Sequence, residues 1–377
     1  MAAVLERCVG DVDDFAAAHW GRRPMLRRDA GDFRDLLDLD GVEHLLATTA
    51  RRPAFRLVRD GRALDPARGT AAVRLGGATL PEVADPWRVA SEVAGGATLV
   101  LQGLQRTWLP LVRFCRALEQ ETSHPVQANA YLTPARAAGL GPHADEHDVL
   151  VVQLEGAKRW TVDGLGDDLS LDAGDVLYLP AGTRHSAAAQ DEPSLHLTIG
   201  LLRVTWRDVV ARVLPPLDDP LPLGFGHDRG RAELVAGLRA TLLDAAAALA
   251  ALDPAAVAEA EQARAGRRRR PLGLGALRSV VEADAIEEDT VVVRPADVRA
   301  TVEPPTAAGE KVVVRLSDRE LRIPAVGTKA CAIALSGTPV RVGDLPELDE
   351  ASRVVLARRL VREGALIVAR SGERDSG

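Results

Sequence analysis

The sequence predicts a mainly β protein with added helices, built around a double-stranded β-helix barrel. Short apolar segments broken by Gly, Asp and Pro follow one another over residues 126–201 with no helical pattern between them. This arrangement favours an antiparallel barrel or sandwich over alternating strands and helices. From Trp206 onward the spacing of apolar residues becomes helical. The chain of 377 residues is also too long for one ordinary core, so two or three domains are expected.

The composition is that of a soluble globular protein, with 46% hydrophobic residues, 27% charged residues and a net charge of −7. The acidic balance argues against non-specific nucleic-acid binding as the main task. No segment approaches the roughly 20 uninterrupted apolar residues that cross a membrane, and the N-terminus lacks a signal-peptide core. Cys8, Cys115 and Cys331 lie far apart and match no zinc or redox spacing. We therefore expect a cytoplasmic protein without a membrane partner.

These patterns divide the chain into four expected parts. They are an N-terminal lead-in that flanks the barrel (1–125), the barrel core (126–203), a helical segment (204–270) and a winged-helix-like domain (271–377). In the lead-in, apolar spacings predict helices at 12–20, 32–46 and 109–119 and strands at 55–58, 71–75 and 97–101. We interpret its tryptophans, Trp20, Trp87 and Trp108, as packing residues.

Within the barrel core, strands are expected at 126–132, 143–154, 158–162, 169–171, 176–179, 185–189 and 194–201. Residues two apart on a strand point to the same face, so His143 and Asp145 are expected to reach one point together. His185 is expected to arrive from another strand. These three residues would form a set of two histidines and one carboxylate.

Such a set leaves positions open on one side of a metal, as in non-haem Fe(II) oxygenases that admit a co-substrate and O₂. A closed structural zinc site would use four ligands, usually with cysteine, and no cysteine is nearby. A His-x-Asp pair is also common on protein surfaces. The metal interpretation is favoured because a Gly-Asp turn at 174–175, a short apolar strand and a Pro-x-Gly-x-x-His sequence would aim His185 into a barrel mouth.

A second group of polar residues is expected beside the metal. Asn129 and Tyr131 share a face of the first barrel strand, and Lys158 begins a later one. A buried lysine without a partner is costly, so one that points into a barrel needs an anion. The distal carboxylate of 2-oxoglutarate would serve as a charge-assisted partner. In the alternative interpretation, Lys158 is a surface lysine at the barrel end and Tyr131 belongs to the core.

The helical segment is expected to contain helices at 206–214, 231–252 and 254–264. The second of these carries an apolar stripe formed by Leu234, Leu238, Leu242 and Ala245 or Ala246. An apolar stripe outside the barrel needs a cover, so we predict that these helices pack against a second copy in a homodimer.

The last part begins after a run of arginines, Arg267 to Arg270, which we interpret as a solvated linker, with a phosphate- or RNA-contacting patch as the alternative. Strands are expected at 291–294, 311–316, 320–323 and 366–369, and helices at 328–336 and 350–363. An ending in which a helix is followed by a strand is typical of a winged-helix shape.

Four sequence motifs together resemble the JmjC/cupin-type ribosomal oxygenases. They are His143-Ala144-Asp145, Gln153-x-x-Gly156-x-Lys158-x-Trp160, Gly174-Asp175-x-Leu177-Tyr178-x-Pro180-x-Gly182-x-x-His185 and Ser194-Leu195-His196-Leu197-Thr198. Members of that family are Fe(II)- and 2-oxoglutarate-dependent protein hydroxylases. The resemblance extends over nearly the whole chain, since the family also has an N-terminal lead-in, a helical dimerisation segment and a C-terminal winged-helix domain.

The resemblance implies roles for individual residues. His143, Asp145 and His185 would bind Fe(II), Lys158, Asn129 and Tyr131 would hold 2-oxoglutarate, and O₂ would be the second co-substrate. The implied substrate is a protein side chain, with a ribosomal protein as the family expectation and a small peptide as an open alternative. A lysine at 158 matches the histidine-hydroxylating members, whereas the bacterial arginine-hydroxylating members place an arginine there or nearby, so the hydroxylated residue stays open.

Three further polar residues near these motifs are left with two interpretations. His196 is either a core histidine beside the metal strand or a catalytic group. His147 and Asp148 follow the triad and are interpreted either as groups that support it or as surface groups.

Two other functions stay open. The first is a cupin enzyme that uses the same metal on a small molecule without 2-oxoglutarate, and such an enzyme would not require Lys158. The second is a binding protein with an inert barrel, whose winged-helix end contacts nucleic acid. The helix expected at 350–363 is not conspicuously basic on one face beyond its four arginines, and winged-helix shapes often serve only as protein-contact modules.

Overall fold

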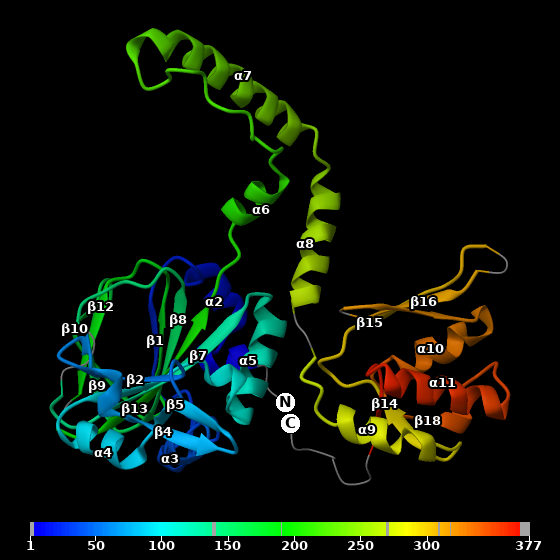
Figure 1. Cartoon of the computed structure of the whole chain (residues 1–377), viewed down its shortest axis with the longest axis horizontal. Helices are drawn as coiled ribbons and strands as arrows, with labels where there is room; N and C mark the ends of the chain where they lie inside the picture. The colour runs from blue at the N-terminus through cyan, green and yellow to red at the C-terminus, as the bar shows by residue number, and fades with distance from the viewer. Residues whose placement is uncertain are drawn as a thin grey trace. The chain divides into compact units, whose positions relative to one another are not determined.

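The computed structural model describes residues 4–137, 141–189, 191–268, 271–307, 310–316 and 318–369. The chain forms two units, Met1–Thr205 and Trp206–Gly377, and Figure 1 shows the elements of each. Separate groups of buried apolar residues stabilise the units: two clusters lie in the first unit and one in the second. The four-part division of the chain stays a prediction.

Two antiparallel sheets build the first unit. The larger has the strand order β1-β11-β8-β13-β7-β6-β2-β3, and the smaller has the order β10-β9-β12. The strands are β1 Met25–Arg27, β2 Phe55–Arg59, β3 Arg62–Ala63, β6 Thr98–Leu101, β7 Val126–Thr133, β8 Asp148–Glu155, β9 Ala157–Val162, β10 Gly166–Asp172, β11 Val176–Leu179, β12 His185–Ala189 and β13 Ser194–Leu201. The antiparallel β architecture predicted from the sequence is therefore confirmed.

The two faces of β8 take part in different clusters of the first unit. Leu150, Val152 and Leu154 belong to the larger cluster, which also includes helix residues, whereas Val149 and Val151 pack with Trp160 and other residues of the smaller sheet. Successive side chains on a strand point to opposite faces, which explains this division. Apolar side chains therefore fill part of the space between the sheets, which is the interior of the barrel.

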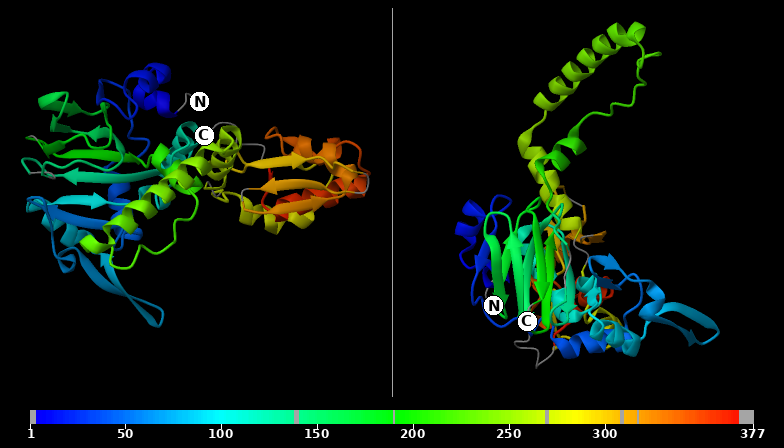
Figure 2. Two further views of the ribbon diagram at one scale, coloured as in Figure 1. Left: turned by 90° about the horizontal axis from the view of Figure 1, so that it is seen from above. Right: turned by 90° about the vertical axis from the view of Figure 1, so that its left-hand side faces the viewer.

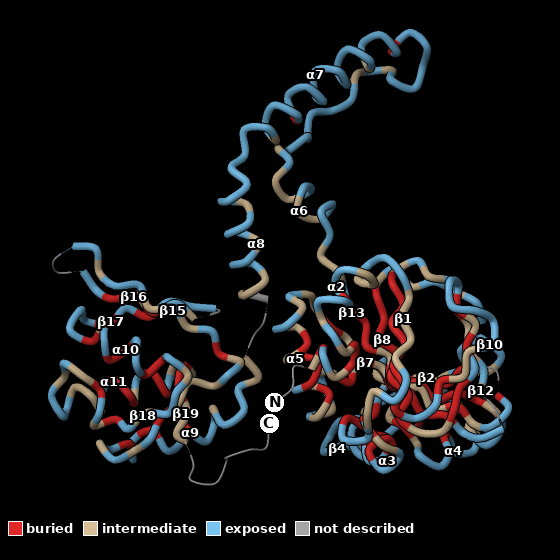
Figure 3. Tube along the Cα trace, turned by 180° about the vertical axis from the view of Figure 1, so that it is seen from behind, coloured by how far each residue is buried: buried red, intermediate tan, exposed pale blue. Residues whose placement is uncertain are grey.

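Helices and one hairpin surround these sheets. The helices are α1 Val4–Val9, α2 Val12–Ala18, α3 Leu39–Thr48, α4 Pro86–Ala94 and α5 Leu109–Thr122, and the hairpin pairs β4 Thr70–Leu75 with β5 Ala78–Ala84. Figure 2 shows this hairpin (light blue) projecting from the unit. Buried residues concentrate on the long strands (Figure 3).

The tryptophans of the lead-in differ in their packing. Trp20 and Trp108 pack against the larger cluster, as expected. Trp87 is 86% exposed, so its interpretation as a packing residue is wrong. It lies two residues before Val89, the buried residue of α4. Two residues correspond to about 200° around a helix, so Trp87 points away from the buried side of α4 that carries Val89.

The second unit begins with the helices α6 Trp206–Val213, α7 Arg231–Ala250 and α8 Pro254–Arg268. Its remaining elements are α9 Ala276–Glu282, β14 Val291–Val293, β15 Ala300–Glu303, β16 Val312–Leu316, β17 Glu320–Ile323, α10 Thr328–Ala334, β18 Val340–Arg341, α11 Glu350–Arg362 and β19 Ile367–Val368. They form two three-stranded sheets, β18-β14-β19 and β15-β16-β17, around one apolar cluster.

The middle of the stripe predicted on α7 is exposed, whereas Ala245 at its end is buried. Leu238 and Leu242 are 56% and 60% exposed, and almost the whole of α7 is pale blue in Figure 3. Arg212 of α6 and Glu261 of α8 form a two-contact ion pair with N–O distances of 2.9 and 2.7 Å.

Among the described residues no single helix is long and apolar enough to span a membrane. Asp228–Ala250 with Pro254–Gly266 meets that test only as a pair of helices bent by 83°.

The arginine run falls largely outside the described residues. Nothing is described of Arg269 and Arg270 or of the side chains of Arg267 and Arg268. Its interpretation as a solvated linker stays a prediction.

Candidate active site

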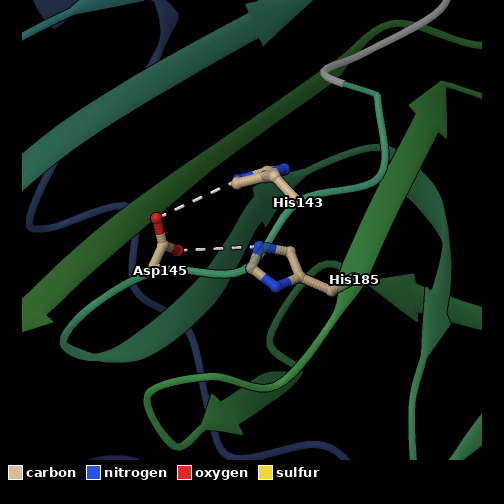
Figure 4. Close-up of side chains that lie close together, drawn as sticks. All are labelled: His143, Asp145 and His185. Carbon is tan, nitrogen blue, oxygen red and sulfur yellow. Dashed lines mark ion pairs between the residues drawn. The ribbon is translucent and has the colours of Figure 1, made fainter.

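Two backbone contacts bring the proposed metal ligands together. The main chains of His143 and His185 form an antiparallel bridge, in which each N–H donates to the carbonyl of the other residue at 3.0 and 2.8 Å. The carbonyl of Asp145 accepts a hydrogen bond from the N–H of Gly182 at 2.9 Å. The loop before β8 is thereby tied to the turn before β12. Figure 4 shows the three side chains that result facing one another.

The distances within this triad suit a shared ion. One potential ligand atom from each of His143, Asp145 and His185 lies within 4.8 Å of the other two. The Asp145 carboxylate oxygens lie 4.0 Å from His143 Nε2 and 3.7 Å from His185 Nε2. Both distances are too long for hydrogen bonds. Two atoms that each lie about 2.0–2.2 Å from one metal ion are at most roughly 4.4 Å apart, so both distances are compatible with a shared ion.

Both imidazoles are oriented by backbone carbonyls. Nδ1 of His143 lies 2.9 Å from the carbonyl oxygen of Gly141, and Nδ1 of His185 lies 3.0 Å from that of Thr183. Because a carbonyl only accepts, each Nδ1 carries the proton and each Nε2 presents its lone pair to the shared point. Burial lowers the pKa of His185, which favours the neutral form that binds metal. The donor set therefore fits a divalent metal with open positions.

Access to the triad is uneven. The side chain of His143 is 39% exposed and that of Asp145 is 32% exposed, whereas His185 is 7% exposed. A large substrate therefore has to approach from the side of His143 and Asp145.

Asp148 supports the turn that carries His185. It is fully buried, and its carboxylate accepts hydrogen bonds from the Tyr178 hydroxyl at 2.6 Å and the Ala181 N–H at 2.8 Å. It also forms an ion pair with Arg203 at 2.9 Å. Burial, together with the hydrogen bond to Asp148, raises the pKa of Tyr178. Of the two interpretations left by the sequence, support for the triad is the one that this geometry favours for Asp148.

Lys158 lies in a cavity of about 110 Å³ that the triad also lines. It is 3% exposed, and its Nζ donates to the Thr133 hydroxyl at 3.1 Å. Among the described residues no carboxylate forms an ion pair with it. Burial lowers its pKa to about 7. An ammonium group in this position requires a bound anion to be stable.

Asn129 and Tyr131 line the same cavity, so the structure brings all six predicted residues to one site. The Asn129 carboxamide oxygen accepts a hydrogen bond from the Gly103 N–H at 3.0 Å, which anchors the side chain and leaves its N–H donors for a ligand. Burial raises the pKa of Tyr131, so its hydroxyl stays protonated. Its ring stacks on His196, with ring centroids 5.0 Å apart and an angle of 6° between the ring planes.

Residues 104–165 and 164–209 match the family described as JmjC domain. This part of the chain is therefore similar to JmjC domains. The predicted resemblance to the ribosomal oxygenases is thereby confirmed.

Curated proteins that are similar to this chain carry related names. The chain is 38% identical over 121 residues to the bifunctional lysine-specific demethylase and histidyl-hydroxylase NO66 of Branchiostoma floridae. This alignment covers 31% of this chain and 19% of that protein. It is 30% identical over 234 residues to ribosomal oxygenase 1 of Gallus gallus, covering 54% of this chain and 37% of that protein. The chain thus matches well under half the length of these relatives.

A solved structure shows the same fold. The ribosomal oxygenase YcfD of Escherichia coli, in complex with cobalt and succinic acid, superposes with a TM-score of 0.51 at 16% identity. The superposition covers 96% of this chain and 99% of that chain.

Some polar residues of the JmjC domain were not predicted. Thr133, the partner of Lys158, follows Tyr131 by two residues on β7, so the alternation that indicated Asn129 and Tyr131 would also have indicated Thr133. Gln127 lies one step the other way on the same face, and its Nε2 is 3.1 Å from His147 Nε2. No signal in the sequence pairs these two residues, because a loop places His147.

Proposed function

We propose that this chain is an Fe(II)- and 2-oxoglutarate-dependent oxygenase that hydroxylates a side chain of a protein. The observation that carries the proposal is the buried ammonium group of Lys158, which faces the cavity of the histidine and aspartate triad without a carboxylate partner among the described residues. A dicarboxylic 2-oxo acid complements this pair of features. One end of the acid would bind the metal, and the other would neutralise the lysine.

The residues of the chain have separate tasks in this reaction. His143, Asp145 and His185 would hold Fe(II), which would supply the redox chemistry that turns O₂, 2-oxoglutarate and a C–H bond into succinate, CO₂ and a C–OH group. Lys158, oriented by Thr133, would bind the distal carboxylate. Asn129 and Tyr131 would position the co-substrate from β7.

Three buried apolar side chains form part of the cavity wall. Val149, Val151 and Trp160 are each at most 4% exposed, and all three line the cavity. An apolar wall of this kind strengthens the electrostatic interaction between Lys158 and an anion. The exposed side of His143 is then the side from which the substrate side chain enters.

We also propose a protein substrate of ribosomal origin. Its support is that the similar proteins are named ribosomal oxygenase and histidyl-hydroxylase. Histidine-hydroxylating members of the family have a lysine at the position of Lys158. A histidine side chain is therefore the first hydroxylation target to test.

Co-substrate turnover tests the proposal. Anaerobically iron-loaded protein is mixed with 2-oxoglutarate, O₂ is admitted, and succinate is quantified. We expect slow turnover by the wild type and none by Asp145→Ala, which lacks a metal ligand. Lys158→Met should weaken 2-oxoglutarate use at least about 100-fold, because it leaves a buried carboxylate without its partner.

Arg159→Met is the matched control for Lys158→Met. Arg159 is the next residue on β9, is 58% exposed and pairs with Asp168 at 3.0 Å. It should therefore leave turnover unchanged. Equal turnover by wild type and Lys158→Met would contradict the assigned role of the lysine. An iron-bound wild type that makes no succinate would instead favour a cupin enzyme that acts on a small molecule without 2-oxoglutarate.

We further propose that α7 and α8 mediate a homodimer, that residues 271–377 form a winged-helix-like domain, and that the protein is cytoplasmic. The exposed leucines of α7 support the dimer. A small core with short sheets and helices supports the domain. Three unpaired buried cysteines, Cys8, Cys115 and Cys331, support a reducing compartment.

A further inference from the structure

His196 is a buried titratable residue to which the proposed function gives no task. It lies on β13 between Tyr131 of β7 and Gln153 of β8, near the middle of the eight-stranded sheet. Its residue exposure is 3%. A hydrophobic residue would fill such a position without the cost of burying a polar ring. The presence of an imidazole there therefore needs a reason.

Two aromatic side chains fix the plane of this imidazole. Tyr131 stacks parallel to it at 5.0 Å, and Trp160 meets it edge-on, with centroids 5.7 Å apart and an interplanar angle of 81°. Trp160 also neighbours the metal ligand His185, with ring centroids 6.0 Å apart. One side chain thus contacts both His196 and a residue of the triad.

The hydrogen-bonding state of the ring follows from its surroundings. Nδ1 is buried and has no hydrogen-bond partner, whereas the residue as a whole lines the cavity. A buried N–H without an acceptor is rarer in proteins than an acceptor with a spare lone pair. We therefore assign the proton to Nε2, the nitrogen left to face the cavity. Burial lowers the pKa of His196, so the ring is neutral and Nε2–H is a single donor.

The ammonium group of Lys158 shares the cavity with this donor. Lys158 is the charged residue whose electrostatic effect reaches His196, and both side chains line the cavity. The hydroxyl partner of Lys158, Thr133, follows Tyr131 by two residues on β7. Tyr131 pairs with His196, so Lys158 and His196 belong to one end of the cavity. That end presents two donors and, among the described residues, no carboxylate.

We propose that His196 donates a hydrogen bond from Nε2 to the same distal carboxylate of 2-oxoglutarate that Lys158 neutralises. This inference rests on the proposed function. A carboxylate has about four lone-pair directions, so it accepts from the ammonium group and the imidazole together. A neutral imidazole adds a donor without placing a second positive charge beside Lys158.

Binding of two ligands separates this role from a structural one. Calorimetry on Mn(II)-loaded protein gives the Kd of 2-oxoglutarate and that of oxalate, which binds metals but has no distal carboxylate. His196→Phe keeps a stacking ring and loses the donor, whereas His196→Gln restores an N–H. We expect His196→Phe to weaken 2-oxoglutarate binding roughly 10- to 100-fold, the value of one hydrogen bond to a charged group, and to leave oxalate binding unchanged.

The outcomes decide between the alternatives. Partial recovery of 2-oxoglutarate affinity in His196→Gln supports the proposal. An unchanged 2-oxoglutarate Kd in His196→Phe overturns it, as does an equal loss for oxalate, which would mean that the ring only shapes the site. A wild type that binds oxalate and not 2-oxoglutarate would contradict the proposed function itself.

A second measurement covers variants that fail to fold. In Zn(II)-loaded wild type labelled with ¹⁵N-histidine, the His196 ring is assigned from its contact with the stacked ring of Tyr131. Addition of 2-oxoglutarate should shift its Nε2 signal, and addition of oxalate should not. An Nε2 signal that ignores 2-oxoglutarate at saturation overturns the proposal.

Discussion

Burial of Lys158 makes the stability of the ligand-free protein depend on pH. Burial lowers its pKa from 10.5 to about 7, so between these values the unfolded state binds more protons than the folded state. Stability should therefore rise with pH across this window, by up to about 1.4 kcal/mol per pH unit. The penalty is fully present below pH 7 and is lost as the pH approaches the unfolded value.

Urea unfolding from pH 7 to pH 9.5 measures this effect as the difference between wild type and Lys158→Met. The difference in free energy of unfolding should shrink as pH rises, because methionine carries no charge to bury. Parallel curves for the two proteins would show that Lys158 is solvated. Saturating 2-oxoglutarate should reduce the pH dependence of the difference, since the anion restores the charged lysine.

Gly200 is a glycine for reasons of space. A Cβ atom there would lie 2.7 Å from His147 Nε2 and 2.9 Å from Gln127 Cγ, and the backbone does not have a positive φ. His147 reaches Gln127 across this position. Gly200→Ala should therefore destabilise the protein by about 1–3 kcal/mol in chemical denaturation. Gly77→Ala, where no atom lies within 4 Å, is the control and should stay within about 0.5 kcal/mol of wild type.

The exposed leucines of helix α7 lead to a prediction about oligomeric state. Its exposed Leu238 and Leu242 are one helical turn apart and share a face. If a second copy covers them, Leu238→Lys with Leu242→Lys should convert a dimer into a monomer in light scattering after gel filtration. Arg239→Ala is the control on the same helix. A wild type that stays monomeric at high micromolar concentration would contradict the prediction.

Local patterns were sufficient for several elements and insufficient for others. The expected strands at 176–179, 185–189 and 194–201 coincide with β11, β12 and β13, because Gly, Asp and Pro bound them. The expected strand at 143–154 begins only at Asp148. His143 and Asp145 therefore meet His185 through loop contacts, and their alternation on a strand was the wrong reason for a correct juxtaposition.

The elements that were not predicted from the sequence are short and have few buried residues to mark them. Strand β5 is mostly exposed, α4 has one buried residue, and α9 follows a glycine-rich stretch. Their positions depend on packing partners far along the chain. No local periodicity carries that information.

At the scale of the whole molecule, pairing between distant segments builds the site. β1 pairs with β11, joining Met25 to Tyr178, and β6 pairs with β7, joining Val100 to Tyr131. Val58, Thr98 and Val100 of the first 125 residues line the cavity. The sequence indicated a flanking role for this part, whereas its strands β1, β2, β3 and β6 belong to the same sheet as β7, β8, β11 and β13. Register between segments this far apart depends on tertiary packing and not on any short pattern.

The region recognisable by similarity is smaller than the region that has to fold together. The JmjC match begins at residue 104, whereas β1, β2, β3 and β6 precede it and continue its main sheet on both sides. A fragment cut at the match would leave β7 and β11 with bare hydrogen-bonding edges, which invite pairing with other chains. It would also lack three residues of the cavity wall. The segment recognised by similarity is therefore not expected to fold or to form the complete cavity by itself.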